Sequence, residues 1–357
     1  MRYWNELEPA GLVRHFLAHP PAGFEPLASA TGTPGFVADF DLLTTADAKV
    51  LAFLAAIPGS RWLRRLLTWR TVFFGATVSE YLTMPVEVAA ETLPGTLRAD
   101  WKRGSRLLIL KDIPLQSSLL SAEEKLYAER FLASCEAQGF IAVEGQALAY
   151  VGIDFASPDE YLGRLSSGRR RNIRRKLRSR AGLRIETLAT GDPQFADARF
   201  LDRLYALYQD VYAQSELHFD KLSTEFFRAV FQDAGLDGRV FLYYVGEQLI
   251  CFNLCFVHRG MLIDKFIGFD YALSRDYNLY FVSWMENLDF ARRHGLSHYV
   301  AGWTDPEIKA YLGASFTFTR HAVYVRNPLL RVVLKKLSRL FERDRAWFDE
   351  HAPAAHS

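Results

Sequence analysis

Apolar and polar residues follow two different periods along this chain. Apolar side chains recur every three or four positions between residues 195 and 213, which predicts a helix, whereas short apolar runs bounded by turn residues predict strands. The predicted helices lie at 42–57, 61–67, 121–139, 157–180, 195–213, 224–232, 277–294 and 328–348, and the predicted strands at 71–75, 106–111, 147–153, 183–187, 239–245, 248–258, 261–268, 298–301 and 314–325.

The alternation of strands and helices predicts an α/β or α+β fold. A length of 357 residues suggests two domains at roughly 100–200 residues each, and half of the residues are apolar, which is enough to form two cores. A serine, a proline and two acids at 157–160 indicate a helix start after the first domain. We therefore divide the chain into residues 1–155, 156–326 and 327–357, the last being a basic amphipathic helix and tail.

Positive charge is concentrated in one predicted helix. The whole chain has a net charge of +2, yet Arg169–Arg180 contains eight cations, so the rest of the chain is net acidic. Such a helix favours an anionic partner, either tRNA phosphates or an anionic lipid surface, although acids elsewhere can also balance a solvated helix. No aromatic residues are interleaved with these cations, which argues against stacking on single-stranded bases.

Other classes of site and location are disfavoured by the sequence. The three cysteines form neither a disulfide framework nor a metal-binding spacing, and no Gly-x-Ser-x-Gly motif is present. No signal peptide and no apolar run of about 20 residues is seen, so we expect no integral membrane segment. We expect a cytoplasmic protein whose basic C-terminal helix can bind it peripherally to the membrane.

Four segments of the second half carry a family resemblance. They are YLGRL followed by GRRRNIRR at 161–175, FIGFD at 266–270, a long helix followed by HY and a glycine at 278–302, and IKAYLGA at 308–314. Their order resembles that of Fem-like transferases and related peptidoglycan biosynthesis or recognition proteins, which belong to the GNAT superfamily of acyltransferases. The resemblance implies tandem GNAT-like domains with mixed central sheets flanked by helices, the first of them degenerate.

The resemblance also implies an N-acyltransferase. An amine acceptor, either a small molecule or a peptide, would attack an activated acyl donor directly, with acyl-CoA or another donor as co-substrate and no tightly bound cofactor. Many GNAT enzymes hold acetyl-CoA with a glycine-rich loop, but the loop at 274–280 has no glycine. The donor can therefore be a differently held CoA thioester, an acyl-carrier thioester or an aminoacyl-tRNA. Arg275, Tyr277 and Asn278 are the residues of this loop that we expect to bind it.

Three residues are candidates for the chemistry. The resemblance to Fem enzymes implies that Lys309 stabilises negative charge on the reacting carbonyl or on the donor, while the alternative is a solvated surface lysine. Tyr299 can protonate a leaving group, and Asp270 can accept a proton from the amine. Both also have ordinary structural interpretations, Tyr299 as a core aromatic and Asp270 as a turn residue.

Four further residues are candidates for substrate binding. Tyr271 and Trp303 lie beside the expected cleft, and Arg170 and Arg174 lie on the basic helix. No metal site is expected. Two alternatives to acyl-thioester chemistry stay open: an aminoacyl-tRNA-dependent Fem-like aminoacyltransferase, and a non-catalytic recognition module with a degenerate transferase fold.

Overall fold

The computed structural model describes residues 2–42, 67–101, 104–215, 219–327 and 330–331. Its chain forms two compact units. Unit 1 consists of Met1–Glu6, Ala22–Ala147 and Thr317–Ser357, and unit 2 consists of Leu7–Pro21 and Leu148–Phe316. The helices predicted at 42–57, 61–67 and 328–348 lie almost wholly outside the described residues.

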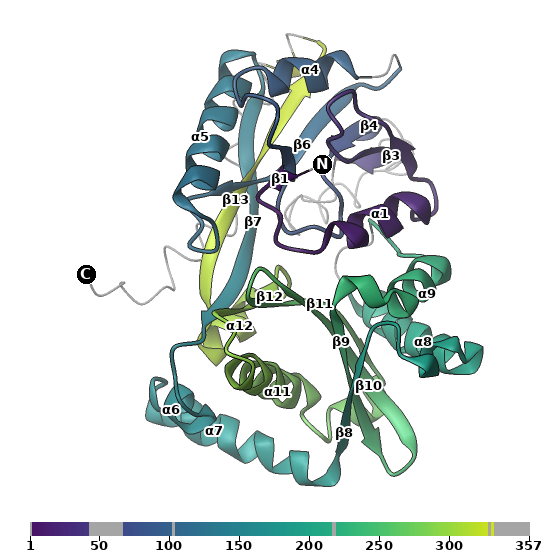
Figure 1. Cartoon of the computed structure of the whole chain (residues 1–357), viewed down its shortest axis with the longest axis vertical. Coiled ribbons are helices and arrows are strands. Elements are labelled where there is room, and N and C mark those ends of the chain that lie inside the picture. Colours follow the sequence, from purple (N-terminus) through teal and green to yellow (C-terminus); the bar gives the residue numbers. More distant parts are fainter. Residues whose placement is uncertain (1, 43–66, 102–103, 216–218, 328–329, 332–357) are drawn as a thin grey trace, which may run out of the picture. The chain divides into compact units, whose positions relative to one another are not determined.

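Unit 1 is a mixed sheet with the strand order β2-β3-β4-β6-β13-β7, and a separate pair, β1 and β5. Helices α4 and α5 supply leucine, alanine and phenylalanine side chains to a core shared with β3, β4 and β6 (Figure 1). Its elements are β1 (Tyr3–Trp4), β2 (Glu25–Leu27), β3 (Gly35–Asp41), β4 (Thr68–Phe74), β5 (Met84–Pro85), α4 (Leu93–Ala99), β6 (Leu107–Leu115), α5 (Ala122–Ala137), β7 (Ile141–Gly152) and β13 (Ser315–Val325).

Unit 2 is a sheet with the order β7-β12-β11-β10-β9-β8. Helices α8 and α9 lie on one face, and α11 with α6 and α7 lies on the other (Figure 1). Its elements are α1 (Ala10–Ala18), α6 (Pro158–Gly163), α7 (Ser167–Leu177), η1 (Arg178–Gly182), β8 (Arg184–Ala189), η2 (Pro193–Ala196), α8 (Ala198–Gln214), α9 (Thr224–Gln232), η3 (Ala234–Leu236), β9 (Gly238–Val245), β10 (Gln248–His258), β11 (Met261–Phe269), α10 (Tyr271–Ser274), α11 (Leu279–Arg293), β12 (His298–Gly302) and α12 (Pro306–Leu312).

The units follow one topological plan and exchange their closing strands. Each has an antiparallel meander, then a parallel pair (β4 with β6, β11 with β12), then a strand antiparallel to the second member of that pair. In chain order β7 follows β6, yet its last residues pair with β12, while β13 follows β12 and pairs with β6. The contiguous division at 155 and 326 therefore differs from the compact units, because each half supplies the strand that completes the other.

Two local predictions are corrected. The strand predicted at 106–111 is longer in the structure: β6 continues through Pro114 to Leu115, and there Pro114 lies opposite Thr319 of β13. Pairing with β4 stops at Leu110, so no N–H is needed from the proline on that side. The helix predicted across 157–180 is divided into α6 and α7, because Ser166 starts a second helix by accepting a hydrogen bond from the Arg169 N–H. The predicted start of α5 is confirmed: Ser121 and Glu124 form a capping box.

Candidate active site

The site of unit 2 begins where its parallel strand pair separates. β11 and β12 pair through three positions that end at Ile263 opposite Val300, while β11 runs on to Phe269 against β10 alone. Within that continuation Lys265 is an extra residue, since Asp264 lies opposite Cys255 and Phe266 lies opposite Leu254. A bulge of this kind re-aims the side chains beside it. The opening between the two strands therefore coincides with a local change in the direction of the β11 side chains.

Lys309 lies at this opening. It is on α12, and only 4% of the residue is exposed. A methyl group added to Gly302, the last residue of β12, would come 3.9 Å from Lys309 Nζ and 3.7 Å from the carbonyl oxygen of Asp264. Lysine is rarely buried to this degree, and a charge withdrawn from water interacts more strongly with nearby charge. The interpretation of Lys309 as a solvated surface residue is therefore wrong.

A buried polar network lies beside Lys309, and most of it was not predicted. The Asp264 carboxylate accepts hydrogen bonds from Tyr299 Oη (2.7 Å), Asn253 Nδ2 (2.6 Å) and Asn287 Nδ2 (3.2 Å). Asn287 Nδ2 also lies 2.7 Å from Asn253 Oδ1. These residues come from β10, β11, α11 and β12, so the network joins the two separating strands to the helix that covers them. The signal in the sequence was an asparagine inside the apolar run ICFNLCF.

Tyr299, a predicted catalytic residue, is fully committed to this network. Burial raises the pKa of its hydroxyl well above the ordinary value, and the charge of Asp264 raises it further. Tyr299 is therefore a neutral O–H donor near pH 7, and it donates to Asp264. The Tyr299 hydroxyl therefore orients the Asp264 carboxylate.

Asp270, the other predicted proton acceptor, is held at the end of β11. Its side chain caps α10 by accepting a hydrogen bond from the Ala272 N–H (3.2 Å), and it forms an ion pair with Arg203 of α8 (3.1 Å). Tyr271 follows it and is half-buried, and its pKa is raised by burial and then by the charge of Asp305. Trp303, which comes directly after β12, is partly exposed.

The predicted donor loop precedes α11. Asn278 adopts φ +49°, a left-handed conformation in which asparagine is the usual substitute for glycine, and no side chain caps the helix. The carbonyl of Tyr277 accepts a hydrogen bond from the Ser179 hydroxyl (2.5 Å). Arg275 is exposed. The loop thus lacks glycine but still presents the N–H groups of an uncapped helix start, which suit an anion.

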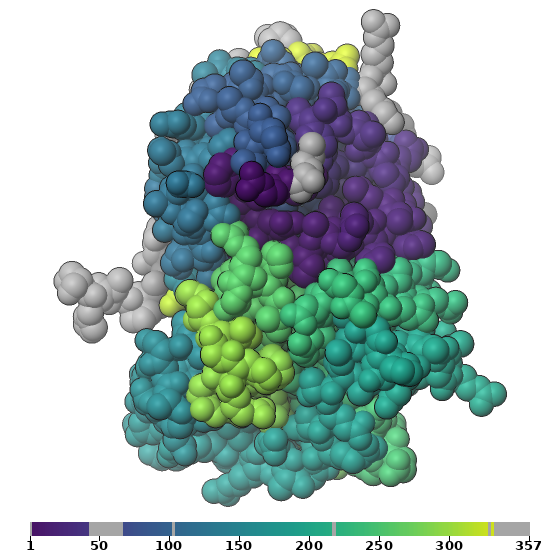
Figure 2. All heavy atoms as spheres, viewed as in Figure 1, coloured from purple at the N-terminus to yellow at the C-terminus, as the bar shows by residue number. Residues whose placement is uncertain are grey.

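The first and last family motifs meet in space. Tyr161 Oη donates to the carbonyl of Leu312, and Asn172 Nδ2 donates to Tyr311 Oη (2.8 Å). Gly313 follows α12 with φ +102°, where any Cβ would lie 3.0 Å from Tyr161 Oη. In Figure 2 the yellow-green atoms around α12 border the teal atoms of α6 and α7. The YLGRL and GRRRNIRR segments therefore hold the helix that carries Lys309.

The basic helix has few acidic partners. Of its eight cations, two pair with an acid among the described residues: Arg174 with Asp159 (2.8 Å) and Arg180 with Glu286. Arg170, predicted to bind substrate, donates to the carbonyl of Gly163 (3.3 Å), and Lys176 lies 3.6 Å from the centre of the Phe281 ring. The exposed arginines without an acidic partner in the described chain are Arg169, Arg171, Arg175 and Arg178.

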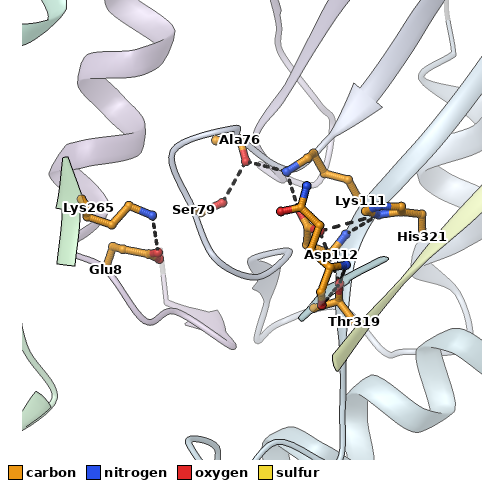
Figure 3. Close-up of polar contacts among 9 residues, drawn as sticks. Glu8, Ala76, Ser79, Lys111, Asp112, Lys265, Thr319 and His321 are labelled. Atoms are coloured by element: carbon orange, nitrogen blue, oxygen red, sulfur yellow. Dashed lines mark hydrogen bonds and ion pairs between the residues drawn. The ribbon is translucent and has the colours of Figure 1, made fainter. Parts of the chain in front are cut away.

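Unit 1 contains a second polar cluster on β6 and β13. Asp112 has φ +58° inside β6, and its N–H donates to His321 Nδ1 (3.0 Å). Lys111 forms an ion pair with Asp112 and donates to the carbonyl of Ala76 (3.3 Å). Figure 3 shows these side chains on β6 and β13, with Lys111 turned toward Ala76. Burial lowers the pKa of His321, so its imidazole is neutral near pH 7.

Neither a metal site nor a membrane span is found in the described part of the chain. In those ranges no three or more His, Cys, Asp and Glu side chains are grouped so that they could hold a metal ion. No described helix is both long enough and apolar enough to cross a bilayer.

The fold of unit 2 is of the GNAT acyltransferase type. Residues 167–310 match the family described as acetyltransferase (GNAT) domain, which confirms the resemblance to the GNAT superfamily in this part of the chain. A search of curated protein sequences found no match.

Solved structures extend the likeness across both units. The C-terminal domain of a putative lysylphosphatidylglycerol synthetase from Agrobacterium fabrum aligns with a TM-score of 0.51 at 16% identity, covering 93% of this chain and 91% of that one. L-PGS from Bacillus licheniformis aligns with a TM-score of 0.52 at 11% identity, covering 95% and 98%. FemX aligns with a TM-score of 0.49 at 11% identity, covering 91% and 98%. At these identities the likeness shows the fold, and the predicted mixed sheets flanked by helices are confirmed.

Proposed function

We propose that unit 2 transfers an acyl group from an activated thioester or ester donor to an amine acceptor by direct attack. The neutral amine forms the new C–N bond, the C–S or C–O bond to the donor breaks, and the leaving group takes a proton. The observation that carries this proposal is the buried Lys309 ammonium at the opening between β11 and β12. A cation fixed in a partly dry site stabilises the oxyanion of the tetrahedral intermediate more than it stabilises the ground state.

Proton transfer is assigned to Asp264 rather than to Asp270. Asp264 is partly exposed on the same opening, and Tyr299 and Asn253 hold its carboxylate in one orientation. Asp270 is engaged by Arg203 and by the α10 cap. In the proposed reaction Asp264 accepts the proton released by the attacking amine, and Tyr299 is a positioning residue for it.

The donor is proposed to bind at the start of α11. The uncapped N–H groups there and Arg275 suit the phosphates of a CoA or carrier thioester, with Asn278 taking the backbone conformation that glycine supplies in other loops. Tyr271 comes soon after β11 and Trp303 directly after β12, and we propose that they contact the acyl group or the acceptor.

An aminoacyl-tRNA donor is the second candidate. The exposed arginines of α7 and η1 favour it, because phosphate contacts of this kind dominate nucleic-acid affinity. One of the fold relatives is named a putative lysylphosphatidylglycerol synthetase, which adds a phosphatidylglycerol surface as an acceptor or docking partner to be tested. On this proposal the protein works at the membrane surface without crossing it.

The test is a binding and transfer panel with acetyl-CoA, a long-chain acyl-CoA, a charged tRNA and phosphatidylglycerol vesicles. Wild type is compared with Lys309→Met and with Lys221→Met, which removes an exposed lysine of the same unit. Thioester transfer that is lost only in Lys309→Met supports the first proposal. Salt-sensitive tRNA binding with aminoacyl transfer selects the second.

A recognition module is the outcome that would overturn both proposals. It would show ligand binding without turnover in the wild type, and Lys309→Met would then bind as well as the wild type does. For the tRNA arm, the double variant Arg171→Ala with Arg178→Ala is expected to weaken the salt dependence of binding. The slope of log K against log salt concentration should become shallower by roughly 0.7–0.9 for each lost phosphate contact. Arg228→Ala, on α9, is the matched control.

A further inference from the structure

A segment from the start of the chain belongs to unit 2. Residues Leu7–Pro21 are grouped with unit 2, although the residues on either side of them belong to unit 1. Within the segment, α1 packs on α9 and η3: His15 Nε2 lies 2.8 Å from Asp233 Oδ2, and Ser223 Oγ donates to the carbonyl of His19 (3.3 Å). The start of the chain therefore contacts residues 223–236, which precede β9 and β10 in sequence.

The same segment supplies a buried carboxylate to the bulge of β11. Glu8 Oε1 lies 3.2 Å from Lys265 Nζ, and the two side chains are only 2% and 6% exposed (Figure 3). Burying both charges costs desolvation energy, so an ion pair of this type adds little net stability but can specify one register of the chain. Lys265 is the extra residue of the bulge.

The bulge decides which face of the sheet each β11 side chain occupies. Before it, Leu262 and Asp264 lie on the α11 side, where Asp264 meets Asn287 and Tyr299. After it, Ile267 and Phe269 lie on that same side, although strict alternation from Asp264 would place them on the other. The extra residue shifts the alternation by one position, so apolar side chains face α11 again after the bulge. It leaves two successive side chains, Lys265 and Phe266, on the opposite face.

That opposite face is aromatic. Phe266 contacts the rings of Phe226 and Phe227 of α9, at centroid distances of 5.9 and 5.3 Å. An ammonium placed on this face requires a counter-charge, since an uncompensated buried cation is strongly destabilising. Glu8 supplies it. If the strand slipped by one residue, Asp264 would turn away from Tyr299 and its carbonyl away from Gly302 and Lys309.

We propose that Glu8 is a positioning residue for the site of unit 2: by neutralising Lys265 it fixes the β11 bulge, so the opening with Asp264 and Lys309 is complete only when Leu7–Pro21 is docked. The inference rests on the proposed function for its catalytic meaning, but its geometry is independent of any substrate. It is tested by two readouts that need no donor. These are hydrogen exchange of the β11 amides and the rate at which acetic anhydride labels Lys309, both followed by mass spectrometry.

The variants are Glu8→Gln, the milder Glu8→Asp, and His15→Ala as a control in the same docked segment. Glu8→Gln is expected to speed exchange across 261–269 and labelling of Lys309 roughly tenfold, because the register loses its counter-charge. Glu8→Asp keeps the negative charge but moves it one methylene further from Lys265, so it should give intermediate increases in the exchange and labelling rates while remaining folded. His15→Ala removes one contact of α1, with Asp233, but keeps the Glu8–Lys265 ion pair, so both readouts should stay at the wild-type rate.

Two results would overturn the proposal. One is wild-type exchange and labelling in folded Glu8→Gln or Glu8→Asp. The other is an equal increase in His15→Ala, which would make Glu8 a general docking contact. If Lys309→Met retains full transfer activity while Glu8→Gln still alters β11, the proposed function fails and the positioning role stands, so the two failures are distinguishable.

Discussion

The two units share a plan but use the opening of their parallel strand pair differently. In unit 1 the chain that leaves β4 packs back onto β6: the Leu82 N–H donates to the carbonyl of Asp112 (2.9 Å), and Tyr81 and Leu82 are fully buried. In unit 2 the chain that leaves β11 turns into α10, and the opening receives Lys309 from α12. The same strand order therefore gives an opening filled by the following chain in one unit and a polar opening that contains Lys309 in the other. Strand order alone does not determine what occupies the opening.

The largest expected effect is a difference in transfer rate between variants of Lys309 in unit 2 and Lys111 in unit 1. Lys309→Met should reduce transfer by roughly 10²–10³-fold, the usual cost of losing one donor to an oxyanion. Lys111→Met in unit 1 should leave the transfer rate within about threefold of wild type, because the Lys111 ammonium donates to the carbonyl of Ala76 and pairs with Asp112. Single-turnover rates with the donor found in the panel measure both. Comparable losses in the two variants would remove the distinction between the units.

A smaller effect is expected at the glycines beside the openings. Gly75 (φ +103°) would bring a Cβ within 2.8 Å of Lys111 Cγ, so Gly75→Ala combines backbone strain with overpacking and should cost roughly 3 kcal/mol of unfolding free energy. Gly302 (φ +78°) has room for a Cβ, and Gly302→Ala should cost only about 1 kcal/mol. Urea unfolding measures both. A larger loss in Gly302→Ala would mean that the opening of unit 2 is the more tightly packed.

The smallest effect is a pH dependence that belongs to unit 1. The pKa of His321 is lowered in the folded state by burial, whereas an unfolded histidine titrates near about 6.5. Below that pH the unfolded chain binds a proton that the folded chain does not, so stability falls as the pH drops, by at most about 1.4 kcal/mol per pH unit for one proton.

Urea unfolding at pH 5 and pH 7.5 checks this. Replacement by glutamine (His321→Gln) should reduce the pH dependence without abolishing it, because burial also lowers the pKa of His258 and of His298 in unit 2. An unchanged pH profile in His321→Gln would show that the unit 1 cluster tolerates the imidazolium.

Local patterns predicted most elements and the position of Lys309. Helix and strand periods and the Ser121 cap act within a few residues, and the order of motifs placed Lys309 after β12. The network partners were harder to predict, because the pairing of β10 with β11 that brings Asn253 to Asp264 runs through the bulge at Lys265, which has no signature in a hydrophobic pattern. Asp270 was predicted to accept a proton or to be a turn residue, and its ion pair with Arg203 could not be predicted because Arg203 lies 67 residues away in sequence.

The exchange of closing strands also bears on how the molecule is made. In unit 1, β13 lies between β6 and β7, so that sheet has a gap at its centre until residues 315–325 have left the ribosome. A nascent chain that ends before β13 exposes the unpaired edges of two buried strands, a state that favours aggregation and chaperone binding. Both units should therefore acquire protease resistance together, late in synthesis, and expression of residues 1–155 alone should give insoluble material.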